Sequence, residues 1–230
     1  MAARASSSTI LLILAMMLMP PCKADYFCGI NNACYMIPSG CTYGNCDFEV
    51  VWSQQANSTK YDFKIAARAT GWVAIAITHD KKMGDDDVYM CSVNETGTGS
   101  KFEHRFNRGR ANIAGSGVGV VNTELTTKNG VVSCRFERDL SVTNNGVTFN
   151  LTTDWYMFFG KGPLVSGNPV QHEKIPMVTK QKVDFSLLPI ISTDDLEDPH
   201  VEDDNGATAH RAGLLLVTCS IMAILTGTQM

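Results

Sequence analysis

Residues 80–88 carry the densest set of side chains that could do chemistry, because Met83 and three consecutive aspartates directly follow an apolar run. Carboxylates such as those of Asp85, Asp86 and Asp87 supply the oxygen ligands that calcium prefers. The segment lacks the spaced Asp-x-Asp-x-Asp-Gly pattern and the later glutamate of a calcium loop. The sequence therefore favours a polar turn here.

Met83 is the residue of this segment that fits a solvated loop least well. Methionine usually fills gaps in an apolar core, yet this one stands between two lysines and a Gly-Asp turn. Its side chain either packs back onto the domain or offers a thioether as a soft axial ligand to haem iron.

The arrangements that identify common enzymes are absent from the sequence. It contains no Gly-x-Ser-x-Gly elbow, no His-Glu-x-x-His, no glycine-rich phosphate loop and no Cys-x-x-Cys. The histidines are scattered, at His79, His104, His172, His200 and His210. The sequence favours an electron-transfer or binding protein over a stand-alone enzyme.

The elements that would position these residues are short strands. Residues 71–78 are almost continuously apolar, as in a central strand buried on both faces. Alternating or apolar runs predict further strands at 48–52, 61–65, 88–93, 101–106, 118–125, 131–136, 147–151, 155–159 and 182–187. Asn129-Gly130 and Asn145-Gly146 are hairpin dipeptides. About ten strands at this spacing predict an all-β sandwich or barrel.

Six of the eight cysteines lie between the two ends that we expect to be removed. Cys91 and Cys134 fall in separate strand candidates, so a bridge between them is the simplest pairing. The other four crowd ahead of the first long strand, at Cys28, Cys34, Cys41 and Cys46. Spacing leaves the connectivity of those four open. An even set indicates three disulfides formed in an oxidising compartment.

Both ends of the chain indicate processing. Residues 1–24 combine Arg4, an apolar run and small residues near the expected cleavage point, which predicts a secretory signal peptide. A transmembrane signal-anchor is the alternative, although the run is short for a bilayer. Residues 206–230 place a second apolar run behind a short polar spacer, which predicts a glycosylphosphatidylinositol (GPI) attachment propeptide with Asn205 as the lipidated residue.

Between these ends we expect a cysteine-rich lead (25–46), a β domain (47–188) and an acidic linker (189–205). The carboxylates at 194–204 repel one another, so this block is expected to act as a stalk, with an acidic docking site for a basic partner as the alternative. Asn57, Asn94 and Asn150 begin N-glycosylation sequons. We expect a GPI-anchored protein on the extracellular face of the plasma membrane, with a secreted form also compatible.

The charge of the chain argues against one class of partner. The formal net charge is −4 and the sequence has no basic run. Nucleic-acid binding is therefore not expected.

Six segments, in order, resemble the DOMON domain of the ferric-chelate reductase 1 group. They are GWVAIA at 71–76, MGDDDVY at 83–89, HRFNRGR at 104–110, GVVSCRF at 130–136, WYMFFGKGP at 155–163 and QH at 171–172. The spacing of the cysteines in the lead also looks like that group. The resemblance covers about residues 28–188 and implies an immunoglobulin-like β-sandwich.

The resemblance also implies a cofactor. In haem-binding relatives, such as the cytochrome domain of cellobiose dehydrogenase, a methionine and a histidine ligate haem b. Carried over by position, these axial ligands are Met83 and His172. The implied function is single-electron transfer with a membrane reductase or a small reductant. The alternative is a haem-free DOMON module that binds a sugar or a cell-surface protein.

Two further groups of residues have an open role. Aromatic residues near the ligand segments could line the haem or belong to the core; they are Trp72, Tyr89, Trp155, Tyr156 and Phe158. A basic cluster could neutralise haem propionates, anchor a partner or form a solvated strand edge; it comprises His104, Arg105, Arg108 and Arg110.

Overall fold

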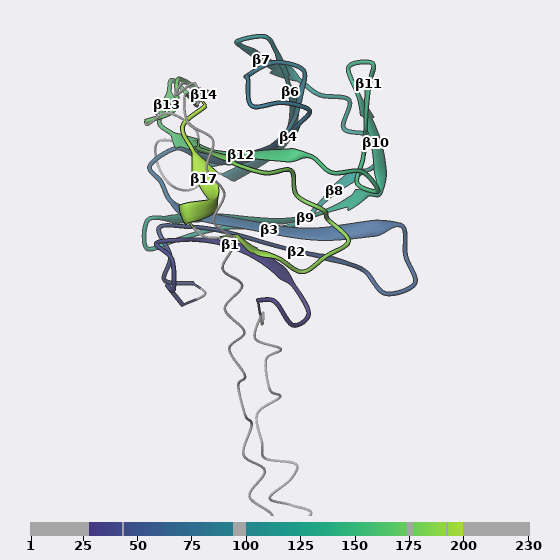
Figure 1. The fold of residues 1–230 in the computed structure, drawn as a ribbon. Helices are drawn as coiled ribbons and strands as arrows, with labels where there is room; N and C mark the ends of the chain where they lie inside the picture. Colours follow the sequence, from purple (N-terminus) through teal and green to yellow (C-terminus); the bar gives the residue numbers. More distant parts are fainter. Residues whose placement is uncertain (1–27, 43, 94–99, 174–176, 192, 200–230) are drawn as a thin grey trace, which may run out of the picture.

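The computed structural model describes residues 28–199, apart from 43, 94–99, 174–176 and 192. The expected signal peptide, Asn94, Asn205 and the expected propeptide lie outside the described residues. In the described part of the chain, no helix is long and apolar enough to cross a membrane. The described strands form two large sheets stacked as a sandwich, with two small hairpins (Figure 1). The predicted all-β class is confirmed.

The first large sheet has six strands. In spatial order they are β16 (Ile190–Ile191), β1 (Ala33–Ile37), β2 (Phe48–Gln54), β3 (Lys60–Arg68), β9 (Val131–Asp139) and β8 (Val120–Lys128). β16 runs parallel to β1, and the other neighbours are antiparallel.

The second large sheet has seven strands. In spatial order they are β17 (Leu196–Glu197), β15 (Met177–Thr179), β12 (Tyr156–Gly162), β4 (Trp72–Thr78), β5 (Asp86–Val93), β6 (Ser100–Arg108) and β7 (Ala111–Ala114). The small hairpins are β10 (Ser141–Asn144) with β11 (Val147–Asn150), and β13 (Leu164–Val165) with β14 (Asn168–Pro169). A 3₁₀ turn, η1, covers Thr193–Asp195.

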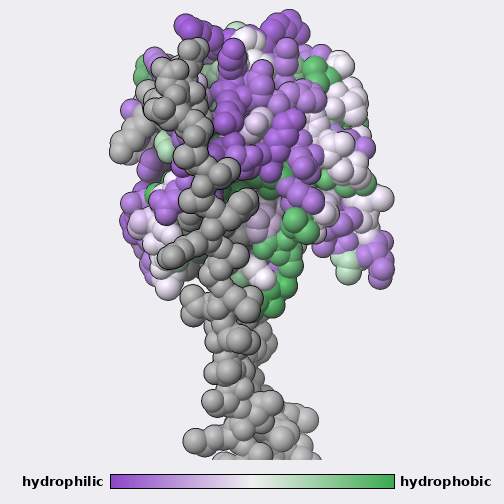
Figure 2. Space-filling model, in the orientation of Figure 1, coloured by the Kyte–Doolittle hydropathy of each residue, from purple (hydrophilic) through white to green (hydrophobic). Residues whose placement is uncertain are grey.

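β4 is buried on both faces, as its apolar run predicts. Val73, Ile75 and Ile77 belong to the main core between the sheets, whereas the alternate residues belong to a second cluster on the outer face of the seven-stranded sheet. Because successive side chains of a strand point to opposite faces, one uninterrupted apolar run serves both clusters. The visible surface outside the grey trace is largely hydrophilic, with a limited hydrophobic area (Figure 2).

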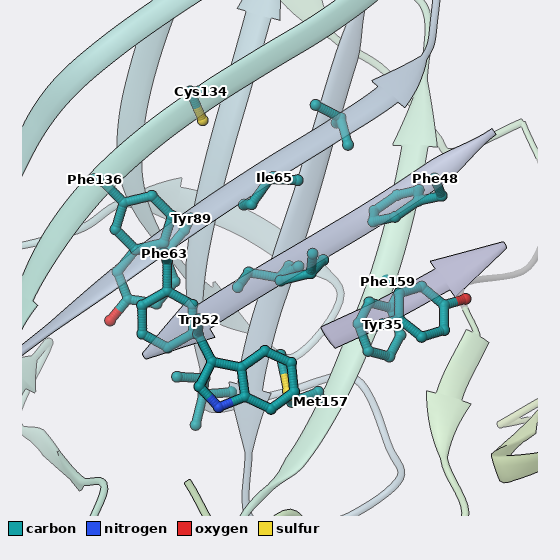
Figure 3. Packing of buried hydrophobic residues seen from close by; sticks show 14 of the residues in the cluster. Tyr35, Phe48, Trp52, Phe63, Ile65, Tyr89, Cys134, Phe136, Met157 and Phe159 are labelled. Carbon is teal, nitrogen blue, oxygen red and sulfur yellow. The ribbon is translucent and has the colours of Figure 1, made fainter. Parts of the chain in front are cut away.

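Strands β5 and β9 face one another across the main core. Tyr89 stacks on Phe136 with ring centroids 4.7 Å apart. Two residues further along each strand, Cys91 and Cys134 form a disulfide, which confirms the predicted bridge. Tyr89, Phe136 and Cys134 lie close together in Figure 3. The bridge ties one sheet to the other.

The two remaining disulfides pair cysteines that are close in sequence. Cys28 bonds Cys34 and Cys41 bonds Cys46, at sequence separations of 6 and 5. The lead is not only loops, because it contains β1, which carries Cys34 and whose Ala33 and Tyr35 enter the main core. The sequence analysis missed this strand because the cysteines around it dominate the pattern.

Both predicted hairpin dipeptides form turns. Asn129 and Gly130, between β8 and β9, have φ angles of 53° and 75°. Asn145 and Gly146, between β10 and β11, have φ angles of 50° and 87°. Two consecutive residues in the left-handed region match the twist of the flanking strands.

The strand predicted at 182–187 is wrong. Only Val183 makes a bridge, opposite Trp155. Asp184 accepts hydrogen bonds from the backbone N–H and the hydroxyl of Ser186. Such a local turn satisfies the backbone without a strand ladder.

The start of the predicted acidic linker belongs to the sandwich. Ile190–Ile191 and Leu196–Glu197 form β16 and β17 at the edges of the two sheets. Ile191 and Leu196 are buried in the main core. These apolar residues outweigh the repulsion between the neighbouring carboxylates, so the described domain extends beyond residue 188.

Removing the inter-sheet disulfide should cost more stability than removing a short one. In the loop-closure model, the 43-residue separation of Cys91 and Cys134 corresponds to about 4 kcal/mol, against about 2 kcal/mol for the separation of 6 between Cys28 and Cys34. Urea unfolding of Cys91→Ala/Cys134→Ala should therefore show the larger loss of unfolding free energy. The matched control is Cys28→Ala/Cys34→Ala. Equal losses, or the reverse order, would contradict this ranking.

Candidate functional site

Met83 lies in the loop between β4 and β5, where 38% of its surface is exposed. The loop is fixed at both sides. Asp86 Oδ2 accepts a hydrogen bond from the Gly84 N–H at 3.0 Å, and the Asp85 N–H donates to the Asn107 carbonyl at 2.6 Å. Gly84 packs so closely on the β6–β7 turn that an added Cβ would lie 3.3 Å from Gly109 Cα. The loop therefore presents Met83 from a defined position.

The three aspartates point to different partners. Asp85 is exposed, Asp86 accepts a second hydrogen bond from the Asn107 amide at 2.9 Å, and Asp87 turns into the main core. Among the described residues, no group of three or more His, Cys, Asp or Glu side chains could hold a metal ion. Only Asp85 fits the favoured polar turn, because Asp86 and Asp87 begin β5 and are buried.

Asp86 is fully buried, and this burial raises the pKa of its carboxyl to about 6. Hydrogen bonds from Thr78, Asn107 and Gly84 act in the opposite direction, while the nearby Asp80 charge raises the pKa further. The effect of burial is the larger one, because the ionised carboxylate loses more hydration free energy than the three hydrogen bonds restore.

Asp87 is the centre of a buried polar network. Its carboxylate accepts hydrogen bonds from the Tyr89 hydroxyl, from His104 Nε2 at 2.6 Å and from the Asn144 amide at 2.8 Å. The Gly117 N–H donates to His104 Nδ1 at 3.1 Å, which leaves the ring proton on Nε2. A charged partner from the other sheet, Arg138 Nη2, lies 4.0 Å from Asp87 Oδ2.

The outer face of the seven-stranded sheet carries the second apolar cluster. Its buried members are Trp72, Ala74, Ala76, Val88, Met90, Phe158 and Val178. Trp72 lies over β12, where a Cβ on Gly162 would come within 2.9 Å of the indole. Glycine at this position leaves room for the ring.

His172 follows β14, next to the far end of β12. Its segment is held by the Trp72 indole N–H, which donates to the Val170 carbonyl at 3.2 Å, and by the Glu173 N–H, which donates to the Lys161 carbonyl at 3.0 Å. His172 Nδ1 is buried and has no hydrogen-bond partner among the described residues. Such an atom has given up its hydration without a replacement.

Met83 and His172 stand at opposite ends of the β4–β12 pair. The Met83 loop starts after Thr78, which lies opposite Tyr156, and Lys81 of that loop contacts the Tyr156 ring. Five residues of strand, spanning about 17 Å, separate Tyr156 from the Lys161 end beside His172. The outer apolar cluster lies along the strands between the two ends.

The structure assigns the aromatic residues and the basic cluster, whose roles the sequence left open, to different parts of the domain. Tyr89 and Trp155 belong to the main core, whereas Trp72, Phe158 and Tyr156 belong to or pack against the outer cluster. The basic cluster is divided, because the His104 side chain is 3% exposed and bonds Asp87 inside the domain. Arg105 instead pairs with Glu103 at 3.0 Å.

Two of the predicted glycosylation sites lie in the described residues. Asn57 is exposed at the turn between β2 and β3. Asn150 ends β11 and is partly buried, and its side-chain oxygen accepts a hydrogen bond from the Thr152 N–H at 3.0 Å.

The sequence analysis missed the buried network, although one signal was available. Asp87 lies on the same face of β5 as Tyr89 and Cys91, because these residues alternate along the strand. Arg138 likewise lies on the same face of β9 as Phe136 and Cys134. A charged residue on the inward face of each strand predicts an ion pair inside the core. Asn144 carried no such signal, because it comes from a separate hairpin.

Comparison with known proteins assigns the chain to a family, since the model of the DOMON domain matches residues 44–162. The chain belongs to the DOMON domain family. It is 29% identical over 147 residues to DOMON domain-containing protein FRRS1L of Homo sapiens, covering 64% of this chain and 49% of that protein. It is 30% identical over 187 residues to putative ferric-chelate reductase 1 of Danio rerio, covering 78% of this chain and 31% of that protein. The chain thus spans about half or less of the length of these relatives.

Two solved structures were found to be similar to the chain at low identity. The cytochrome domain of Myriococcum thermophilum cellobiose dehydrogenase is 10% identical with a TM-score of 0.45, covering 57% of this chain and 72% of that one. The cytochrome b domain of pyranose dehydrogenase from Coprinopsis cinerea is 11% identical with a TM-score of 0.46, covering 62% of this chain and 88% of that one.

The buried Asp86 should make stability fall as pH rises. Its folded pKa of about 6 lies above the ordinary value of 3.8, so the native state prefers the protonated carboxyl. This contribution is fully present below pH 3.8 and is lost as pH rises through about 6, a change on the order of 2 to 3 kcal/mol. Asp86→Asn should remove this part of the pH dependence in urea unfolding between pH 4 and 7.

The exposed neighbour supplies the control for this measurement. Asp85→Asn should leave the pH dependence of the unfolding free energy as in the parent protein. Parallel curves for the parent and Asp86→Asn would show that the carboxyl does not titrate in this range.

Proposed function

We propose that this DOMON protein is an extracellular, membrane-tethered b-type haem protein that passes single electrons to or from a partner. The proposal rests on the apolar outer face of β4, β5 and β12. A loop with the Met83 thioether lies at one end of this face, and at the other end lies His172, whose Nδ1 has no hydrogen-bond partner among the described residues. Met83 and His172 would be the axial ligands.

The donor atoms of Met83 and His172 suit such a group. An imidazole and a thioether are an established ligand pair for haem iron, and the buried Nδ1 of His172 shows an imidazole whose hydrogen-bonding capacity is not used up. Ala74 and Ala76 are the smallest buried members of the outer cluster, and Trp72 and Phe158 are the largest.

If haem were held by Met83 and His172, it would supply reversible one-electron chemistry, and the thioether would raise its reduction potential. The other residues of the site act on the ligands. Asp86 holds the backbone of the Met83 loop, and Trp72 holds the segment that carries His172. The buried outer cluster would keep water away from a group bound between them.

The relatives suggest partners for the electron. Several of them are named ferric-chelate reductase 1 or putative ferric-chelate reductase 1, which supports a membrane reductase or a small reductant as the partner of this chain. We further propose the extracellular face of the plasma membrane as its location, with a GPI anchor at Asn205.

A haem-free module that binds a sugar or a cell-surface protein is the second candidate. The separation of Met83 and His172 along the β4–β12 pair favours it, since the two side chains would have to reach toward one another to share an iron. The two candidate functions predict different visible spectra, and they predict different effects of substituting Met83 and His172.

A visible spectrum of the secreted protein tests the cofactor. The haem protein should show a Soret band and, after reduction, a sharp α band. Met83→Ala and His172→Ala should each lose the six-coordinate low-spin signature, because each removes one axial ligand. Met36→Ala and His79→Gln are matched controls, since Met36 lies on the other sheet and His79 contacts the ring of Trp155. A colourless protein that stays colourless when haem is added would support the second candidate.

Treatment of intact cells with a phosphatidylinositol-specific phospholipase tests the anchor. The enzyme should release the protein into the medium, because it cleaves the lipid of a GPI anchor. Substitution of Asn205 and its small neighbours by bulky residues should prevent surface attachment. Protein that stays on the cells after treatment would argue for another form of attachment.

A further inference from the structure

β8 leaves a long strand edge open. The strand has nine residues and ends the six-stranded sheet, with β9 on one side and no described strand on the other. The other terminal strands of the two large sheets are shorter, since β16 and β17 have two residues each and β7 has four. Proteins usually keep such edges short, because unpaired N–H and C=O groups offer hydrogen bonds to another strand. The open edge of β8 is therefore a site at which a further strand could pair.

The register of the hairpin shows which backbone groups of β8 face this open edge. The Gly130 carbonyl accepts a hydrogen bond from the backbone N–H of the residue that follows β3, so Gly130 faces the β3 side. Backbone groups alternate in direction along an antiparallel strand, so those of Val131 face β8 and its partner Lys128. By the same alternation, the N–H and C=O groups of Thr127 and Leu125 point to the open edge.

Residues 124–128 form the regular part of this edge. A bulge between Asn122 and Glu124 interrupts the ladder to β9, and the turn at Asn129 ends it on the other side. The segment reads Glu-Leu-Thr-Thr-Lys and contains no proline. Its side chains are exposed apart from that of Leu125, which packs against the main core. The backbone of the segment is thus accessible and regular.

The charged side chains of the segment lie on one face. Leu125 and Thr127 lie opposite buried residues of β9, so they are on the inner side of the sheet. Glu124, Thr126 and Lys128 alternate with them and lie on the outer side. The carboxylate and the ammonium group are therefore on the same face, on either side of Thr126.

Two copies of this segment are complementary when they run antiparallel around Thr126. Each Thr126 then faces its copy, and Glu124 of one chain faces Lys128 of the other. Leu125 of one chain faces Thr127 of the other, which brings the outward backbone groups together in about four hydrogen bonds. The Glu124–Lys128 pairs fall at the alternate positions, where cross-strand side chains are closest.

Neighbouring registers lack this pairing of charges. An axis at Leu125 places Glu124 opposite Thr126, and an axis at Thr127 places Lys128 opposite Thr126. A lysine on an edge strand ordinarily hinders pairing with a second copy. Here the glutamate four residues earlier makes the same lysine complementary to a copy of its own strand.

We propose that two copies of this chain pair through β8, antiparallel and centred on Thr126, so that their six-stranded sheets join into one. The interface has twofold symmetry, in which the same surface serves both subunits. A second copy is the occupant because the strand itself supplies both charges of each pair. The interface does not depend on the proposed haem function, because the haem face belongs to the seven-stranded sheet.

Sedimentation velocity over a series of protein concentrations tests the proposal. The parent protein should show a monomer–dimer equilibrium. Glu124→Lys and Lys128→Glu should each weaken association roughly tenfold, because twofold symmetry places like charges opposite one another at both ends of the paired segment. The double variant Glu124→Lys/Lys128→Glu restores opposite charges and should associate as the parent does. Lys101→Glu, exposed on β6 of the other sheet, is the matched control and should leave association unchanged.

A cysteine on the axis tests the register. Thr126→Cys should form an intermolecular disulfide under mild oxidation, because side chains that face one another at such a position are within reach of a disulfide. Thr148→Cys, an exposed threonine on β11, is the control and should stay monomeric. Non-reducing electrophoresis separates the two results.

Three outcomes would each overturn the proposal. They are a parent protein that stays monomeric, a double charge variant that associates no better than the single ones, and equal cross-linking of the two cysteine variants. A monomeric parent would leave the open edge of β8 to a strand from another protein. None of these results bears on the visible spectrum that tests haem.

Discussion

The contact between β5 and β9 is the constraint on which the sandwich depends. Three tiers join these strands across the core. Asp87 faces Arg138, Tyr89 stacks on Phe136, and Cys91 bonds Cys134. An ion pair, a ring stack and a covalent bond at two-residue steps fix both the distance between the sheets and the register of one against the other. A slip of one residue would turn all three inward groups of β5 outward.

This constraint also determines what each face of the seven-stranded sheet is able to do. With Asp87, Tyr89 and Cys91 committed to the inner side, the intervening Val88 and Met90 must face outward. The outward-facing residues of β5 in the outer apolar cluster are therefore a consequence of the three contacts between β5 and β9. The same alternation gives β12 an inner Phe159 and an outer Phe158.

Much of the fold could be predicted from local patterns. The buried run of β4, the alternation in β2, β3 and β9 and the two Asn-Gly turns depend on neighbouring residues only. β1 and β16 could not be predicted in this way, because their pairing joins residues 34 and 190. The error at 182–187 has the opposite cause. The apolar pattern there predicts a strand, but a short-range turn at Asp184 forms instead.

The candidate site was predictable only in part for the same reason. Residue chemistry pointed to Met83, and the family resemblance pointed to His172, but neither could show that strand register places their loops at opposite ends of β12. The roles of Asp86 and Trp72 in holding those loops depend on partners 21 and 98 residues away in sequence. Contacts of this length become visible only when the sheets are assembled.

The last described strands give the domain a mechanical property. β16 joins the six-stranded sheet and β17, a few residues later, joins the seven-stranded sheet. A pulling force applied beyond residue 197 would first load the short β17–β15 pair and then the β16–β1 pair. Each pair is only two residues long, so tension would peel them away in sequence. The covalent bridge between β5 and β9 would meanwhile keep the two sheets together. The edge of the domain would therefore yield under load well before its centre.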